Sequence, residues 1–141
     1  MVQPIQDVTV HETERTLIFP NGLIGCPEWR RFTVEAPEEL PGLLVLRSLD
    51  EPGIEFVLAP VLELVPDFLE QLAPVDRAAL HALGVGTTAE VELWTTLSVH
   101  DDGTVTANLL GPLVLDFARG CGTQVILADS GWGTRHPIVT A

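Results

Sequence analysis

The stretch "EVELWTTLSVHDDGTVTANLL", residues 90–110, decides the fold class. Apolar side chains at Val91, Leu93 and Leu97 alternate with polar ones, which is the period-two pattern of a strand with one buried face. The run ends in "HDDG", a turn signal in which Gly103 is free to adopt a positive φ, and a second alternating run, "TVTANLL", follows. The segment therefore predicts an antiparallel hairpin in a β-rich protein.

Short β-type runs continue on both sides of this hairpin. Downstream, "LVLDF" and "TQVILA" flank the turn "ARGCG" and predict a second hairpin. Upstream, Gly- and Pro-rich breaks separate five more runs: "DVTV", "TLIF", "RFTVEA", "LLVLRSL" and "IEFVLAP". Helices are expected only over 66–72 ("PDFLEQL") and 74–84 ("PVDRAALHALG"), because each starts with Pro followed by an acid. We expect a mainly β, antiparallel β-barrel-like single domain over residues 1–141, with two short helices inserted mid-chain.

The composition is that of a soluble protein with one core. The chain has 141 residues, which is enough to bury a core without disulfides or metals. No apolar run approaches the roughly 18–20 residues of a membrane span, and the N-terminal residues lack the pattern of an export signal. We therefore expect a cytoplasmic protein without membrane contact. Cys26 and Cys121 are expected to be free thiols, and the scattered histidines predict no metal site and no cofactor.

Charge is the most informative part of the composition. Twenty acidic residues face seven basic ones, all arginines, for a net charge of −13. Such a protein repels phosphate backbones, so direct nucleic-acid binding is disfavoured, and it attracts a basic partner. Solubility alone is the competing explanation. The segment 35–76 holds ten acids and only Arg47 against them, so it should carry the strongest negative field, with Asp50, Glu51 and Glu55 as candidate contacts.

Trp94 interrupts the alternation of the opening stretch. By register it shares the polar face of its strand with Glu92 and Thr96. Aromatic side chains are enriched at protein interfaces, so an exposed Trp94 is a candidate anchor for a partner. The alternative is that a helix or loop covers it.

The tail "ADSGWGTRHPIVTA", residues 128–141, contains the residue types of a nucleophilic triad. A working triad, however, draws its nucleophile, base and orienting group from separate elements, and Asp129 and Ser130 are adjacent. The tail also lacks a G-x-S-x-G elbow. The sequence therefore argues against an enzyme, and a small hydrolase using Ser130 and His136 is the alternative to test.

The segment "ANLLGPLVLDFARGCGTQVILADSGWGTRHPI", residues 107–138, strongly resembles the end of the flagellar assembly factor FliW family. That family shows a V-N-L-x-A-P-I-V-I-N run, a basic-Gly turn, Q-V-I-L and a closing S-T-R-H-P. The N-terminal half agrees, since "IFPNGLIGCPEWRRF" and "LRSLDEPGIEFVLAP" resemble two further family patterns. The C-terminal matches are Asn108, Leu109, Pro112, Val114, Arg119, Gly120, Gln124, Val125, Leu127, Thr134, Arg135, His136 and Pro137. Four positions depart from the family pattern: Cys26, Gly111, Asp116 and Gly133.

The resemblance implies a non-enzymatic cytoplasmic protein with a β-barrel-like fold. Members of that family bind flagellin, and they bind and antagonise the RNA-binding translational regulator CsrA, which represses flagellin synthesis. The resemblance therefore implies two protein partners, flagellin and a CsrA-type regulator. A flagellin chaperone that acts without CsrA is the second interpretation.

The tail then has two interpretations besides catalysis. Pro137 is expected to stop the sheet ladder and Arg135 to pair with nearby acids, which would pin the tail to the domain. The same Arg135 and His136 are also candidates for docking a partner. Trp132 lies between two glycines in an expected loop, so we predict that it reaches a partner.

Overall fold

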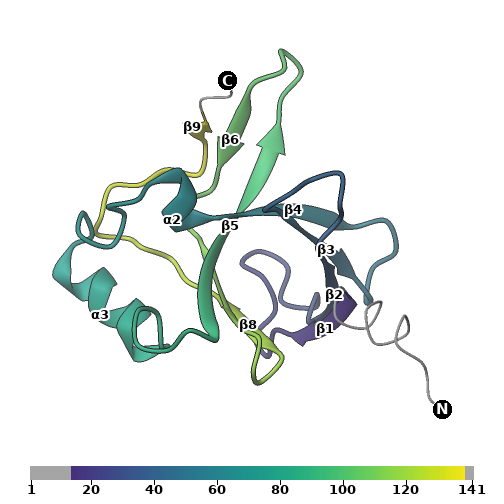
Figure 1. Ribbon diagram of the computed structural model, residues 1–141, viewed down its shortest axis with the longest axis horizontal. Coiled ribbons are helices and arrows are strands. Elements are labelled where there is room, and N and C mark those ends of the chain that lie inside the picture. The colour runs from purple at the N-terminus through teal and green to yellow at the C-terminus, as the bar shows by residue number, and fades with distance from the viewer. Residues whose placement is uncertain (1–13, 139–141) are drawn as a thin grey trace.

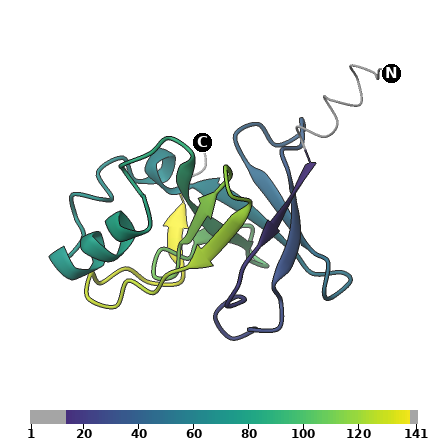
Figure 2. The ribbon, with the colours of Figure 1, turned by 90° about the horizontal axis from the view of Figure 1, so that it is seen from below.

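A computed structural model describes residues 14–138 of the protein. The described part of the chain is mainly β and contains two helices, which lie together on one side of the strands (Figures 1 and 2). The elements in chain order are β1 (Glu14–Ile18), β2 (Arg31–Glu35), β3 (Leu44–Ser48), β4 (Glu55–Pro60), α2 (Val61–Leu64), α3 (Pro74–Ala82), β5 (Val91–Val99), β6 (Val105–Ala107), β7 (Leu113–Asp116), β8 (Cys121–Gln124) and β9 (His136–Ile138).

Seven of the strands close into a barrel. The sheet runs in the order β4-β3-β2-β1-β8-β7-β5, and β4 pairs with β5 to close it, from Val57 opposite Leu97 to Pro60 opposite Trp94. The expected β-barrel is therefore confirmed. The expectation that it is antiparallel throughout is wrong at one place, because β1 and β8 pair in parallel at Ile18 and Cys121.

The barrel interior is filled by side chains from nearly every strand. Phe19 and Phe32 meet edge to face with ring centroids 5.3 Å apart. Gly122 of β8 makes room for this pair, because a Cβ there would lie 2.5 Å from the Phe19 ring. The buried members of this inner core are Leu17, Phe19, Leu23, Phe32, Val34, Leu46, Leu58, Trp94, Leu113 and Leu115.

A second core, which we call the outer core, lies outside the barrel, between its wall and the two helices. Leu93 of β5 and Val114 of β7 face Val61 of α2 and Leu80 of α3 there. The middle of β5, residues 93–95, is therefore buried on both faces, which the alternation in the sequence does not reveal. Of the two interpretations of Trp94, the covered one holds: its face of β5 points into the barrel, so strands rather than a helix or loop leave the residue only 8% exposed. Trp94 is therefore not an exposed anchor for a partner.

Beyond the barrel, the end of β5 continues with β6 and β9 as a projecting ribbon (Figure 1). Both predicted hairpins are present: β5 and β6 pair from Leu97 to Val99, and β7 pairs with β8 along its length. Gly103 has a φ of +87° in the first turn. The prediction that Pro137 stops the ladder is wrong, because Pro137 lies within β9, opposite Thr106. A proline is tolerated there because β9 is the edge of the ribbon.

The helix expected over 74–84 is present as α3, but the one expected over 66–72 is wrong. The first helix is α2, which ends at Leu64, before Pro66, because the residue preceding a proline is disfavoured in helical geometry. Residues 66–71 instead form turns whose carbonyls bind the Arg77 guanidinium, with distances of 2.9 Å to Leu69 O and 3.1 Å to Glu70 O.

The other expected runs match with small shifts. The strand expected over 123–128 is found earlier, as β8, and β9 lies in a part of the tail where no strand was expected. The expected run "DVTV" lies outside the described residues. In the described range, neither helix is long and apolar enough to cross a membrane.

The position of Trp94 gives the first prediction. Trp94→Ala should lower the free energy of unfolding by about 3–5 kcal/mol, since it empties the centre of the inner core. Val99→Ala on the same strand is the control, because Val99 is 76% exposed and its loss should change stability by less than about 0.5 kcal/mol. Urea unfolding followed by circular dichroism measures both, and equal effects of the two substitutions would contradict the burial of Trp94.

Candidate partner-binding surface

The C-terminal loop is fastened to α3 by a buried carboxylate. Asp76 is 6% exposed, and its Oδ2 accepts hydrogen bonds from Ser130 Oγ at 2.5 Å and from the Asp129 amide at 3.1 Å. Ser130 Oγ in turn accepts the Ala73 amide at 3.0 Å. The Ser130 hydroxyl is thus committed to Asp76, and within residues 14–138 no hydrogen bond joins it to His136. The nucleophile and base that a hydrolase would need are not brought together.

Trp132 packs into the same loop rather than standing free. It is half-buried, and its ring stacks on Phe68 with centroids 5.2 Å apart and lies edge-on to His136 at 5.4 Å. Trp132 therefore packs against the domain, and contact of its remaining exposed part with a partner stays a prediction. Phe68 belongs to the outer core, so Trp132 extends that core over the surface of the loop.

Arg135 binds a histidine and not an acid. Its Nη2 lies 3.2 Å from His100 Nδ1, and the other ring nitrogen, Nε2, lies 2.7 Å from Thr106 Oγ1. Because a guanidinium only donates, Nδ1 is the acceptor here. The expected pairing of Arg135 with nearby acids is absent among the described side chains. Arg135 instead ties the tail to the β5–β6 hairpin, in line with the structural interpretation of the tail.

The acidic segment 35–76 does not form one patch. Glu38 and Glu39 lie in the loop from β2 to β3, whereas Glu51 lies in the loop from β3 to β4. In an antiparallel meander, successive loops lie at opposite ends of the strands. The predicted field is therefore divided between the two ends of the barrel.

Asp50, one of the predicted contacts, holds the fold together. Its Oδ2 accepts the backbone amides of Arg30 at 2.9 Å and Arg31 at 2.8 Å, and its Oδ1 pairs with Arg31 Nη2 at 3.0 Å. These two amide bonds, chiefly the one from Arg31, hold the pKa of Asp50 below its usual value. Its carboxylate thus fastens the β3–β4 loop to the start of β2.

Glu55 is likewise paired within the protein. Arg47 of β3 lies between neighbouring strands and forms ion pairs with Glu35 of β2 and with Glu55 of β4, the latter at 2.6 Å. Of the three predicted acidic contacts, only Glu51 has a carboxylate without a hydrogen bond or ion pair to another described residue. The Glu51 backbone amide donates to Ser48 Oγ, and the Glu51 carboxylate faces solvent.

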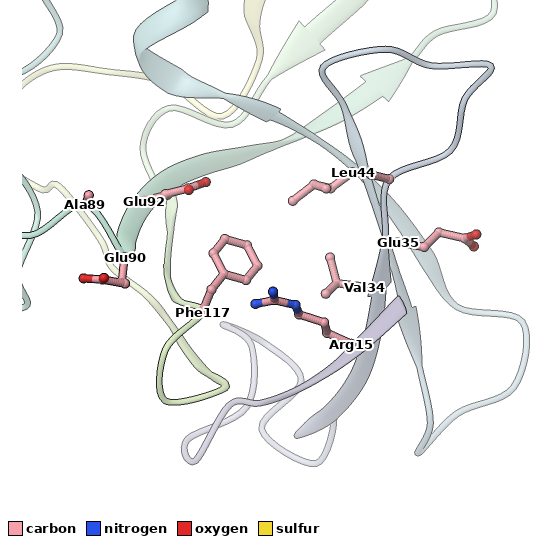
Figure 3. A pocket seen from close by; sticks show the side chains of 9 residues that line it. Arg15, Val34, Glu35, Leu44, Ala89, Glu90, Glu92 and Phe117 are labelled. Atoms are coloured by element: carbon pink, nitrogen blue, oxygen red, sulfur yellow. The ribbon is translucent and has the colours of Figure 1, made fainter. Parts of the chain in front are cut away.

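A pocket of about 380 Å³ opens at the end of the barrel where β1, β3 and β5 begin and where β2 and β7 end. We call it the mouth pocket. In Figure 3, Arg15, Phe117 and Glu92 point toward one another across it, whereas Glu35 and Glu90 point away. Its lining includes Arg15, Val34, Leu44, Glu90, Glu92 and Phe117.

Two contacts organise the mouth pocket. The Arg15 guanidinium lies over the Phe117 ring, 5.9 Å from its centroid, and Glu92 Oε1 accepts the Trp94 indole Nε1–H at 2.9 Å. Glu92 thus stands at the rim of the mouth pocket, and Trp94, the next residue on the same face of β5, lies deeper in the barrel. Sequence reasoning missed this pocket because only closure of the barrel brings its lining segments together. The two exposed acids at the start of β5, Glu90 and Glu92, were the local signal.

Comparison with known proteins extends these observations. The family model described as "FliW protein" matches residues 4–138. The chain belongs to the FliW family. The flagellar assembly factor FliW of Syntrophotalea carbinolica is 32% identical over 127 residues, 90% of this chain and 89% of that protein. The corresponding protein of Geobacillus kaustophilus is 31% identical over 132 residues, covering 92% and 88%. A crystal structure of the flagellar assembly factor FliW has the same fold, with a TM-score of 0.72, 24% identity and coverage of 99% of this chain and 92% of that one.

Several positions of the FliW pattern serve the fold in this chain. Gln124 donates to Gly111 O at 2.9 Å and accepts the Ile24 amide at 2.8 Å, which joins segments 100 positions apart. Asn108 Oδ1 accepts the Gly111 amide at 3.0 Å. These hydrogen bonds thus hold the backbone that leads into β7. The FliW pattern around Gly111 therefore serves the fold, and it shows common ancestry rather than a binding surface.

The contacts of Ser130 predict a structural role. Ser130→Ala should lower the free energy of unfolding by about 1–3 kcal/mol, because the buried Asp76 carboxylate loses one of its donors. Ser98→Ala on the exposed end of β5 is the matched control and should be nearly neutral. Thermal unfolding measures both. A Ser130→Ala protein as stable as the parent, combined with lost esterase activity, would restore the hydrolase interpretation.

The contacts of Asp50 predict a pH dependence. Because its pKa is lowered in the folded state, the ionised carboxylate stabilises the fold above the ordinary value of 3.8, and this contribution disappears as the pH falls through the folded-state value. Asp50→Asn should therefore lower the melting temperature at pH 7, and the gap to the parent should shrink as the pH falls below 4. Glu51→Gln, one residue away, should leave the melting temperature nearly unchanged at every pH. A gap for Asp50→Asn that stays constant with pH would contradict the ionic contribution.

Proposed function

We propose that this protein is a non-enzymatic cytoplasmic flagellar assembly factor that binds flagellin and a CsrA-type RNA-binding regulator, and that it relieves repression of flagellin translation by occupying the regulator. The observation that carries the proposal is membership of the FliW family over almost the whole chain, whose relatives are named flagellar assembly factors. No catalytic step is needed, since both partners act by binding and release.

The charge of the protein supports a basic partner. A regulator that binds RNA presents basic side chains, and a protein of net charge −13 is attracted to such a surface and repels the competing RNA. Part of this charge lies at the mouth end of the barrel, with Glu38 and Glu39 in the loop that joins two lining segments of the mouth pocket. Electrostatic attraction of this kind acts chiefly on the rate of association.

The contacts of Ser130 favour a binding protein over a hydrolase. The Ser130 hydroxyl and the His136 ring are each engaged by other residues, Asp76 and Trp132. The second candidate function is a flagellin chaperone that acts without the regulator, and the acidic mouth end argues for the regulator as an additional partner.

Pull-down against purified flagellin and purified CsrA-type regulator tests the proposal directly. Capture of both, each in competition with the other or at separate surfaces, supports it. Capture of flagellin alone selects the chaperone. Capture of neither by the intact protein overturns the proposal.

Charge reversal tests the electrostatic contribution. Glu38→Lys with Glu39→Lys should slow association with the regulator by about threefold to tenfold at low salt and should flatten the dependence of the rate on salt. Glu63→Lys with Glu70→Lys gives the same change in net charge on the helical side and serves as the matched control, with a smaller effect expected. Stopped-flow association at several salt concentrations measures this. Equal rates for the parent and the mouth-end variant at every salt concentration would contradict attraction through this surface.

A further inference from the structure

We propose that the mouth pocket is a receptor for an arginine side chain of a partner protein, and that Arg15 occupies it as an internal stand-in until the partner arrives. The proposal rests on the proposed function in one respect, that the partner is a protein with exposed basic residues. It adds the site, the side chain that the site takes and the residue that competes for it.

The pocket has the two groups that recognise a guanidinium. The Phe117 ring supplies an aromatic face, and the cation of Arg15 already lies over it at 5.9 Å. Glu92 supplies a carboxylate directed at the same space, as Figure 3 shows. Its Oε1 is held by the Trp94 indole at 2.9 Å, so the second oxygen remains to accept from a bound cation in a fixed orientation.

The pocket has room for a second side chain. A volume of about 380 Å³ is open with Arg15 in place. It corresponds to roughly a dozen waters at about 30 Å³ each. Val34 and Leu44 provide apolar wall on which the methylene groups of an incoming arginine can pack.

The charge around the pocket selects a cation. Glu92 points into it, Glu90 lies at its edge with the carboxylate turned away, Glu38 and Glu39 lie in the adjoining loop, and Glu35 is paired with Arg47. Arg15 is the basic residue in the lining. An anion would therefore meet surplus negative charge here, whereas an arginine restores the balance.

Arg15 is held loosely enough to be displaced. The ion pairs between described side chains involve Arg31, Arg47 and Arg119, and none of them involves Arg15. Arg15 is also exposed, so its guanidinium passes into water when it leaves the ring and no buried charge is left unpaired. An internal ligand competes with an external one, and the apparent affinity for the external ligand falls in proportion to the fraction of time in which the site is free. Removal of Arg15 should therefore strengthen binding of an external arginine.

Titration with a minimal probe tests the site on the intact protein. The probe is N-acetyl-arginine amide, and N-acetyl-citrulline amide is its uncharged counterpart of the same shape. The Trp94 indole N–H signal in ¹H–¹⁵N spectra is the reporter, because this group donates to Glu92. We expect a saturable shift with the arginine probe and none with the citrulline probe.

Four variants separate the roles of the residues. Arg15→Ala should tighten binding of the arginine probe by about threefold, and Phe117→Leu should weaken it by about threefold, the change expected from one exposed cation–π contact. Glu92→Gln should also weaken it, although its amide oxygen still accepts the Trp94 indole and preserves the fold. Asp101→Asn removes the same charge at the tip of the β5–β6 hairpin and should leave the affinity unchanged.

Two results would overturn the proposal: equal shifts from the arginine and citrulline probes, or an Arg15→Ala protein that binds the arginine probe no more tightly than the parent. Pull-down with the same variants keeps this outcome distinct from the proposed function. If flagellin and the regulator bind Glu92→Gln and Phe117→Leu as well as they bind the parent, the receptor is wrong and the proposed function stands. If the arginine probe binds but neither protein does, the proposed function is wrong and the site stands.

Discussion

The pairing of β5 with β4 is the constraint on which the rest of the structure depends. β5 pairs with β7 over its first residues, with β4 over its middle and with β6 over its end. One nine-residue strand thus closes the barrel, forms a wall of the outer core and carries the projecting ribbon. Because successive side chains of a strand point to opposite faces, β5 places Leu93 outside the barrel and Trp94 inside it, and closure buries both.

The same closure creates the mouth pocket. β4 leaves β5 at Pro60, opposite Trp94, and turns into α2, so the first residues of β5 have no partner on that side. Glu92 therefore stands at a rim instead of within a continuous wall, and the strands on the far side contribute Arg15 and Leu44. A pocket at this position follows from the topology, whereas its charge follows from the residues that the sequence places at the strand ends.

Local patterns predicted the barrel well because hairpins depend on neighbours in the sequence. The alternation around Leu93 and the turn at Gly103 are both local, and both hairpins formed as expected. The failures come from contacts between distant segments. Trp94 is buried by strands that lie far from it in the chain, and the turns over 66–71 are held by Arg77, a residue outside that segment. Asp50 was expected to face a partner because the amides that bind it, from Arg31 and its neighbour, lie 19 and 20 positions away.

The seven arginines explain how so acidic a chain keeps its charge on the surface. Arg31, Arg47 and Arg119 neutralise carboxylates, Arg30 and Arg77 bind backbone carbonyls, and Arg135 binds His100. Two of these tasks use the several donors of the planar group, since Arg47 joins two carboxylates and Arg77 binds three carbonyls, which a lysine ammonium would do less well. Most of the positive charge is thus engaged within the protein, although these arginine side chains lie at the surface, and the acids left over give the surface its field. Arg15 differs from the other six because its contact is an aromatic ring at the rim of an acidic pocket, and this contact can be given up without leaving a buried charge unpaired, as the proposed exchange with a partner's arginine requires.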